Sequence, residues 1–593
     1  MSSNARRPRA GACVTCRSRK RRCIPTSSGE PCQLCHSLGK SCSLSLVSRP
    51  TRVDQEPPPA VEERLSNASD VTITGLVSRQ LSIELVSLYF HYIHDIPHTI
   101  FHEPTFMRRI YDGTAPMVHI YAMCALAARF SDNAVFDTTA PCDRGQLFAT
   151  EAVRLCQSCM ISPSLETVQG FLLIGYYYSG EGNVDGKHIY IGLARLHAER
   201  LSCSEDANAV YQEEYRRAWL SIHVASHWSA WDMAMEPESL TKGPDFLPQI
   251  DDATWRTASA EMLNLHQTQD VFRCDMWAQM ARTLGVFAKI HTLLLQMSHS
   301  AISFDDYCAQ AAHLEVALDQ WSENLPPKLT WNFDNLMFLA GRRLGQIYLA
   351  MHAGVSHFRQ MLFFPFLDAR AAKQLGPSQA NKCKESAAVV SSILQYCKNI
   401  RNCELDYFIY GHIGVVSSCV HLHTLLFSDD FRELSITRQR LVSNFQYLMA
   451  VKSYWPIVEH HTIHLRTFQN SCRDSISDPF VLDNWMARFL TEHSSLLSER
   501  QLVPVQATEP ETPVASERKT GSGHATPAVL PTIEFLTSQQ SKNDANTVVD
   551  GSVQPNNISR LLHDQEITGE ALIDSALSWL LDDRYDSNKV TPT

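Results

Sequence analysis

The sequence predicts a mostly α-helical protein with a small cysteine-rich N-terminal domain, a large all-helical body and disordered linkers. At 593 residues, the chain is too long for one compact core and should form two or more domains. Six of its 18 cysteines lie within the first 42 residues. From about Leu81 onward, apolar residues recur at helical spacing, and few alternating runs indicate strands. These observations predict at least two domains of different chemistry.

Charge is divided unevenly along the chain. Residues 1–52 contain 11 Lys and Arg and one acid, Glu30, which leaves 41 basic and 62 acidic residues in the remainder. A basic head on an acidic body indicates that the head meets a polyanion. The basic N-terminus lacks the apolar segment of a signal peptide, so we expect the thiols to face a reducing cytosol or nucleus. Such a compartment favours metal binding over disulfides.

The clustered cysteines have a duplicated spacing of two, six, eight, two and six intervening residues. They are Cys13, Cys16, Cys23, Cys32, Cys35 and Cys42. Structural zinc takes four tetrahedral ligands, so six thiolates make one full site with two left over, or two sites if two sulfurs bridge. The segment has almost no large apolar side chains, so the metal would have to supply the folding free energy. The alternative, unliganded cysteines on a disordered tail, does not explain the duplication.

A run of cations lies between the second and third of these cysteines. It comprises Arg17, Arg19, Lys20, Arg21 and Arg22. Lys and Arg suit the guanine N7 and O6 acceptors in the major groove, and further cations neutralise phosphates. Such residues also lower the pKa of neighbouring thiols and favour the metal-ligating form. A nuclear import signal or a solvated charge run is the alternative, but the position between two ligands favours DNA contact.

The segment ACVTCRSRKRRC, followed by PCQLCHSLGKSC, resembles the fungal-type binuclear zinc cluster family of transcription factors. The resemblance implies two zinc ions bridged by Cys13 and Cys32, with a short helix after each CxxC pair. It also implies that the helix from Arg17 to Arg22 enters the major groove, where Lys20 reads a GC-rich triplet. Nuclear localisation, double-stranded DNA and transcriptional coactivators follow from the same resemblance. Ile24 departs from the acidic or small polar residue that the family often has there.

The body resembles the fungal-specific transcription factor middle domain over about residues 81–470. The resemblance rests on LVSLYFHYIHDIPHTIFHEPTF, GKHIYIGLARLHAERL and EEYRRAWLSIHVASHWSAWD. The first segment should form a helix whose apolar face runs from Leu81 to Ile96, closed by Pro97. Ile189, Leu193 and Leu196 mark a second helix, and Val389, Ile393, Tyr396 and Ile400 a third. The family's Gly-Arg-Pro segment is changed here around Lys242, Gly243 and Pro244.

Several other patterns in the body favour core packing over a site. Residues 407–428 lack charged side chains and are long enough to span a bilayer, but their His, Ser and Thr content favours a buried core helix. Cys156 and Cys159 form a CxxC without a second ligand pair beside them, and small core residues are the commoner interpretation of this spacing. His460 and His464 could share one helix face, but EHHTIH lacks the HExxH order. Trp219, Trp228 and Trp231 have near-helical spacing. GxSxG, Walker and GxGxxG patterns are absent, so we do not expect an enzyme.

Composition divides the chain into five segments: 1–47, 48–80, 81–498, 499–557 and 558–593. The second holds a Pro-Pro-Pro run and lacks aromatic residues, and the fourth is proline-rich with one aromatic residue, so both are expected to be disordered. The last is acidic and amphipathic, with Ile573, Leu577 and Leu580 on one helix face and Trp579 at its margin. This segment is either an activation segment that contacts a partner protein or a final helix docked on the body.

The sequence therefore predicts a nuclear, zinc-dependent, sequence-specific transcription factor for RNA polymerase II genes, with no membrane association. The acidic tail favours a role as an activator. Regulation of metabolic or secondary-metabolite genes is what the resemblance implies. The alternative is a helical small-molecule-binding or enzymatic domain with a zinc-dependent protein-interaction module. A homodimer stays open, since residues 48–80 show no sustained leucine heptad. A small-molecule effector also stays open as a partner. Target genes, half-site spacing and the choice between activation and repression are not determined.

Overall fold

A computed structural model describes residues 23–24, 32–37, 78–204, 206–233, 247–265, 276–428, 430–474, 480 and 482–492. The chain divides into two compact units, Met1–Val71 and Thr72–Thr593. The described part of the first unit is built around one short helix, α2 (Gln33–Ser37). In the described part of the second unit every regular element is a helix, and His94 and His98 form an isolated β-bridge. The prediction of a mostly α-helical chain is confirmed.

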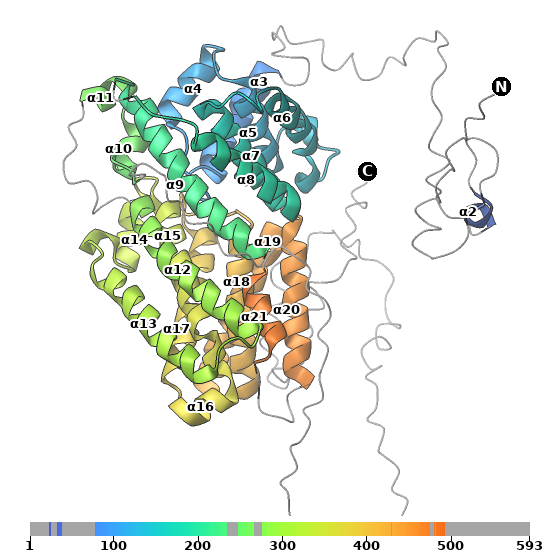
Figure 1. The fold of residues 1–593 in the computed structure, drawn as a ribbon, viewed down its shortest axis with the longest axis vertical. Coiled ribbons are helices and arrows are strands. Elements are labelled where there is room, and N and C mark those ends of the chain that lie inside the picture. Colours follow the sequence, from blue (N-terminus) through green and yellow to red (C-terminus); the bar gives the residue numbers. More distant parts are fainter. Residues whose placement is uncertain are drawn as a thin grey trace, which may run out of the picture. The chain divides into compact units, whose positions relative to one another are not determined.

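The first half of the second unit is a group of nine helices, coloured blue to green in Figure 1. They are α3 (Arg79–Tyr92), α4 (Glu103–Tyr111), α5 (Met117–Ala127), α6 (Gln146–Ser158), α7 (Leu165–Gly180), α8 (Val184–Ala198), α9 (Ala209–Asp232), α10 (Asp252–Thr257) and α11 (Ala260–Leu265). Helix α7 packs against α5 and α8, and α8 packs in turn against α9.

The second half contains ten helices, coloured green to orange in Figure 1. They are α12 (Met276–Ser298), α13 (Phe304–Glu323), α14 (Phe333–Ala340), α15 (Gly345–Phe363), α16 (Ala369–Leu375), α17 (Ser378–Asn399), α18 (Ile409–Phe427), α19 (Phe431–Lys452), α20 (Ile457–Asp474) and α21 (Asn484–Thr491). Helix α12 contacts both α9 and α15, and one continuous hydrophobic core joins the two halves.

Side-chain caps define where many of these helices begin. Ser164 accepts a hydrogen bond from the Thr167 amide at 3.1 Å, and Asn183 accepts one from the Gly186 amide at 2.8 Å. Asn332 caps α14 in the same way. A cap of this kind satisfies one of the four amides that the first helical turn leaves without a partner, and typically stabilises the helix by about 1 kcal/mol.

The first helix of the body begins and ends earlier than the sequence predicts. Helix α3 starts at Arg79, after the capping residue Ser78, and ends at Tyr92. Leu85 and Tyr89 of the expected apolar face are buried, and Leu81, Leu88 and Tyr92 are partly buried. Ile96 is buried but lies beyond the helix, in a turn where Asp95 has φ 65°. The Asp95 carboxylate binds the His94 ring at 3.2 Å and the Arg256 guanidinium at 3.1 Å. These contacts hold Asp95 in its left-handed conformation. Helix α3 therefore ends at Tyr92, before it reaches Pro97.

Helix α8 is present as predicted, but the predicted apolar residues are not its buried face. Ile189 and Leu196 are 57% and 56% exposed, whereas Ile191 and Ala194 are buried. Small residues decide the orientation: a Cβ on Gly175 of α7 would come within 2.9 Å of Ile191 Cγ1. The close approach of α7 and α8 therefore selects the Ile191 side of α8, although the other side is more apolar in sequence.

The uncharged segment 407–428 forms a core helix, which confirms that prediction. Every residue from Tyr410 to Leu425 of α18 is buried. Its polar side chains find partners on neighbouring helices: the His421 ring hydrogen-bonds Ser391 Oγ of α17 at 2.8 Å, and the Asn444 amide of α19 donates to Ser417 Oγ at 3.2 Å. None of the described helices is both long and apolar enough to cross a membrane.

Candidate functional site

The described part of the N-terminal unit contains three of the six clustered cysteines. Helix α2 begins one residue after Cys32 and includes Cys35, so the two thiols lie three residues apart, on one face of the turn. The His36 amide donates to the Cys32 carbonyl at 2.9 Å, and the Gln33 amide donates to the Ile24 carbonyl at 3.1 Å. The second bond fixes the residue that follows Cys23 against the start of α2. All three cysteines are thereby held in one small structure.

The thiols are the buried side chains of this structure. Cys32 and Cys35 are 0% and 1% exposed, whereas Gln33 and His36 of the same helix are exposed. Neither buried thiol belongs to a hydrophobic cluster of the described residues. Buried thiols in a segment whose sequence has almost no large apolar side chains match a metal-organised domain, in which thiolates are the ligands that zinc prefers. The residues present therefore fit a structural zinc site.

The remaining predicted site residues lie outside the described residues and stay predictions. Among the ligands these are Cys13, Cys16 and Cys42, and among the DNA-contacting residues they are Arg17, Arg19, Lys20, Arg21 and Arg22. Segment 242–244, residues 48–77 of the first linker, the second linker and the acidic tail also lie outside. Residues 78–80, which the sequence predicts as linker, form the cap and the start of α3. One detail of the expected helices differs: α2 begins inside the second CxxC pair, at Gln33, and not after it.

The Arg-Arg-x-Trp segment of the helical body forms a buried electrostatic clamp on α9. Arg217 binds Glu213 Oε1 at 2.9 Å, and it donates to Thr99 Oγ1 at 3.0 Å and to the Ile250 carbonyl at 2.7 Å. Both charged side chains are fully buried. Glu213 also accepts a hydrogen bond from the Gln249 amide at 3.1 Å. The pair ties α9 to the loop before α4 and to the segment before α10.

A second buried arginine joins the two halves of the body. Arg129, in the turn Ala128–Phe130 after α5, donates to the Tyr454 carbonyl at 2.7 Å and binds Glu181 at 3.1 Å. Its guanidinium lies 3.9 Å from the centre of the Trp455 ring, a cation–π contact. The sequence analysis did not single out Arg129, because nothing local distinguishes it from an exposed arginine.

Lys187 and Asp232 form a third buried ion pair that sequence reasoning missed. Lys187 lies on the buried face of α8, and its ammonium contacts the Asp232 carboxylate at the end of α9. Their side chains are 5% and 0% exposed. Burial lowers the pKa of Lys187 to about 7, because the protein interior disfavours the charged form. A lysine within GKHIYIGLARL has no local signal that indicates burial.

The other patterns that the sequence offered are explained by packing. Cys156 is buried, and burial raises its pKa to about 12, whereas Cys159 is exposed at the end of α6. No group of three metal-ligating side chains occurs among the residues that the structure describes. Of the pair on α20, His464 is buried and His460 is partly exposed. Trp219 and Trp231 are buried and Trp228 packs against them from a half-buried position, as expected of core residues.

Two family models match the chain. Residues 11–51 match the fungal Zn(2)-Cys(6) binuclear cluster domain, and residues 86–323 match the fungal specific transcription factor domain. The binuclear cluster domain binds two zinc ions, which agrees with the predicted cofactor. The second match extends from α3 to the end of α13 and so includes the Arg217 clamp and the Lys187 pair.

Curated relatives agree with these matches. An uncharacterized transcriptional regulatory protein of Schizosaccharomyces pombe is 32% identical over 54% of this chain and 35% of its own length. The Zn(2)-C6 fungal-type transcription factors FTF1a and FTF2 of Fusarium oxysporum f. sp. lycopersici are each 23% identical over 68% of this chain and about two fifths of their own length. The chain thus matches well under half of each of these relatives, and no solved structure matches it. The chain matches the zinc cluster domain and the fungal specific transcription factor domain in this order, and the relatives FTF1a and FTF2 are named Zn(2)-C6 fungal-type transcription factors.

Proposed function

We propose that this chain is a nuclear, zinc-dependent, sequence-specific DNA-binding protein that regulates RNA polymerase II genes. The observation that carries the proposal is the duplicated cysteine spacing, together with the burial of Cys32 and Cys35 in its second half. The family match over residues 11–51 supports it. In this role the chain is not an enzyme, and its nucleic-acid partner is double-stranded DNA with GC-rich triplet half-sites.

Six thiolates would hold the zinc ions: Cys13, Cys16, Cys23, Cys32, Cys35 and Cys42. Zinc supplies no redox chemistry; it supplies the free energy that folds a segment with almost no apolar side chains. Six thiolates and two divalent cations leave a net charge of about −2. The cations between Arg17 and Arg22 help to offset that charge, and they also place a positive surface next to the cluster.

The helical body and the tail have separate proposed roles. The body, about residues 81–498, is the regulatory domain, and the segment 558–593 contacts transcriptional coactivators through its apolar residues, so that the protein acts as an activator. Homodimerisation would place two clusters on two half-sites. Regulation of a metabolic or secondary-metabolite pathway is the finer role that the resemblance supports.

Replacing Lys20 separates base reading from phosphate binding. Lys20→Ala should lower the affinity of the zinc-loaded chain for a GC-triplet site by about 1 to 3 kcal/mol more than its affinity for random DNA. Arg6 belongs to the basic N-terminus before the first cysteine, where we expect a phosphate contact. Arg6→Ala is therefore the matched control, because losing a phosphate contact should weaken both complexes alike. Fluorescence anisotropy at a fixed salt concentration measures both. Equal losses for Lys20→Ala on the two probes would remove its base-reading role.

A further inference from the structure

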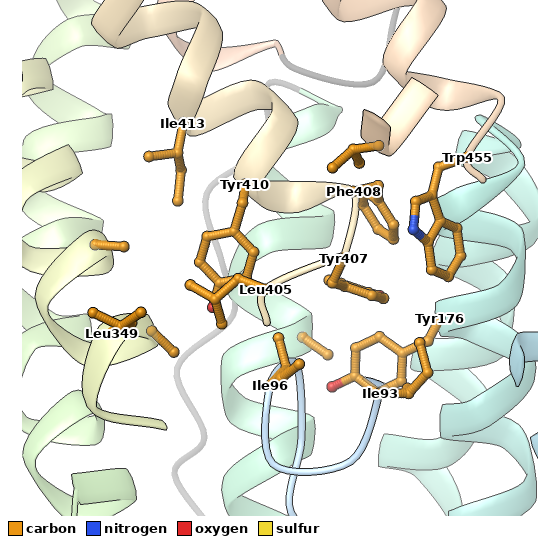
Figure 2. Close-up of a cluster of buried hydrophobic side chains, with 14 of the residues drawn as sticks. Ile93, Ile96, Tyr176, Leu349, Leu405, Tyr407, Phe408, Tyr410, Ile413 and Trp455 are labelled. Carbon is orange, nitrogen blue, oxygen red and sulfur yellow. The ribbon is translucent and has the colours of Figure 1, made fainter. Parts of the chain in front are cut away.

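A cavity of about 130 Å³ lies inside the helical body, where α7, α8, α9, α12, α15 and the start of α18 meet. Most of its lining is apolar, and Ile96, Ile191, Met280, Phe358 and Ile413 are among the side chains that form it. Figure 2 shows part of this wall, with the Tyr407 ring next to that of Phe408, where the ring centres are 4.3 Å apart, and with Ile96 and Tyr410 in the same cluster. An apolar cavity of similar size in another protein, at about 150 Å³, stays dry and binds benzene.

Two polar groups on the lining have no hydrogen-bond partner within the described part of the chain. They are the Tyr407 hydroxyl and the Trp277 indole nitrogen, and each of these residues is 2% exposed. Buried donors are almost always paired in native proteins, because leaving one unpaired forfeits its bond to water. The neighbouring Tyr176 hydroxyl, by contrast, donates to the Pro97 carbonyl at 3.2 Å. Among the described residues, no acceptor therefore faces the Tyr407 hydroxyl or the Trp277 indole N–H. A bound molecule could supply one.

The one charged side chain among the described lining residues is already neutralised. Lys187 lines the cavity, and its ammonium contacts the Asp232 carboxylate behind it. A ligand with its own negative charge would have to compete with Asp232 for the ammonium in a largely apolar site. The wall therefore suits an uncharged molecule, which leaves this ion pair intact.

We propose that the cavity binds a small, uncharged, largely apolar molecule whose carbonyl oxygen accepts a hydrogen bond from Tyr407 or Trp277. Its walls come from both halves of the helical body, so an occupant is buried between α7–α9 and α12–α18 and stabilises their packing. Binding itself follows from the cavity, whereas its consequence, an effector that biases a transcription regulator, rests on the proposed function.

Three probes of similar size test the chemistry: acetophenone, ethylbenzene and benzoate. Thermal unfolding of the zinc-loaded full chain, supported by ligand-observed NMR, gives their relative affinities. We expect acetophenone to bind about fivefold more tightly than ethylbenzene, the value of one hydrogen bond, and benzoate to bind more weakly than both. Tyr407→Phe combined with Trp277→Phe should reduce the acetophenone preference to less than about twofold.

Filling the cavity provides a variant that does not depend on polar groups. Gly354 of α15 lines the cavity, and a Cβ at this position would meet no atom within 4 Å, so Gly354→Leu should occupy the space and abolish binding of all three probes. Gly192→Leu on α8 is the matched control, since its Cβ also has open space but Gly192 does not line this cavity. Unchanged affinities in Gly354→Leu, or no binding by the unsubstituted chain, would overturn the proposal.

The remaining outcomes are also decisive. Equal affinity of acetophenone and ethylbenzene would refute the hydrogen-bonding part, and tighter binding of benzoate would refute the uncharged class. Specific DNA binding is measured on the same preparations. If the unsubstituted chain binds acetophenone but no specific DNA, the proposed function alone is rejected. If it binds specific DNA but none of the probes, the cavity proposal alone is rejected.

Discussion

Replacing Arg217 with leucine should destabilise the helical body much more than the same replacement of its neighbour Arg216. The Arg217 side chain is fully buried and binds Glu213 within α9. Its hydrogen bonds to Thr99 Oγ1 at 3.0 Å and to the Ile250 carbonyl at 2.7 Å join α9 to two segments that lie more than 30 residues away in sequence. Arg217→Leu leaves the fully buried carboxylate of Glu213 without its closest cation. Breaking a buried pair in this way costs about 3 to 5 kcal/mol of unfolding free energy.

Arg216 provides the control on the adjacent position of the same helix. Its side chain is 22% exposed, and it meets Glu213 Oε2 at 3.4 Å, a longer contact than that of Arg217. Partly exposed pairs of this kind contribute about 0 to 1 kcal/mol, so Arg216→Leu should have a small effect. Arg217→Lys keeps the charge but loses the planar fork, and it should lie between the two.

Urea unfolding of the zinc-loaded chain, followed by tryptophan fluorescence, measures these differences. All ten tryptophans lie after residue 72, so the signal reports on the second unit. A large fall in the urea midpoint for Arg217→Leu and a small one for Arg216→Leu is the expected pattern. Equal effects, or a loss below about 1 kcal/mol for Arg217→Leu, would refute the clamp.

Two further predictions concern buried groups. Burial lowers the pKa of His421 to about 3, so between pH 6.5 and 3 the unfolded chain binds a proton that the folded chain does not, and stability falls as pH falls. His421→Gln should reduce this pH dependence by up to about 1.4 kcal/mol per pH unit. Urea unfolding from pH 7 to 4.5 measures the slope, and His313→Gln, at an exposed position, is the control. Equal slopes for the two variants would contradict the prediction. Gly180→Ala places a Cβ 2.3 Å from the Trp455 ring and should cost about 1 to 3 kcal/mol in thermal unfolding, whereas Gly192→Ala, with open space, should be neutral or stabilising. A stable Gly180→Ala protein would show that this packing is wrong.

The sequence predicts helix existence well because periodicity is a local property. Helices α3 and α18 follow directly from apolar spacing and from the absence of charge. The buried face of α8 does not, because it depends on a glycine of α7 that allows close approach at Ile191. Ile189 and Leu196 are consequently exposed, although their spacing alone favours burial.

The candidate sites divide in the same way. The cysteine ligands are predictable, since metal binding requires fixed residue types at short spacing, and the burial of Cys32 and Cys35 agrees with that role. Lys187 and Asp232 are 45 residues apart, and only the packing of α8 on α9 brings them together. The cavity beside them is also a product of long-range packing, so no local pattern in the sequence indicates it.

Native mass spectrometry of the full chain tests the central claim most directly, because it counts the metal ions that the cysteines hold. We predict two zinc ions per chain, lost together in Cys32→Ser, since the resemblance makes this thiolate a bridge between them. The same preparation should lose its affinity for specific DNA when a chelator removes the metal. One zinc ion per chain, or none, would contradict the shared cluster on which the proposed function rests.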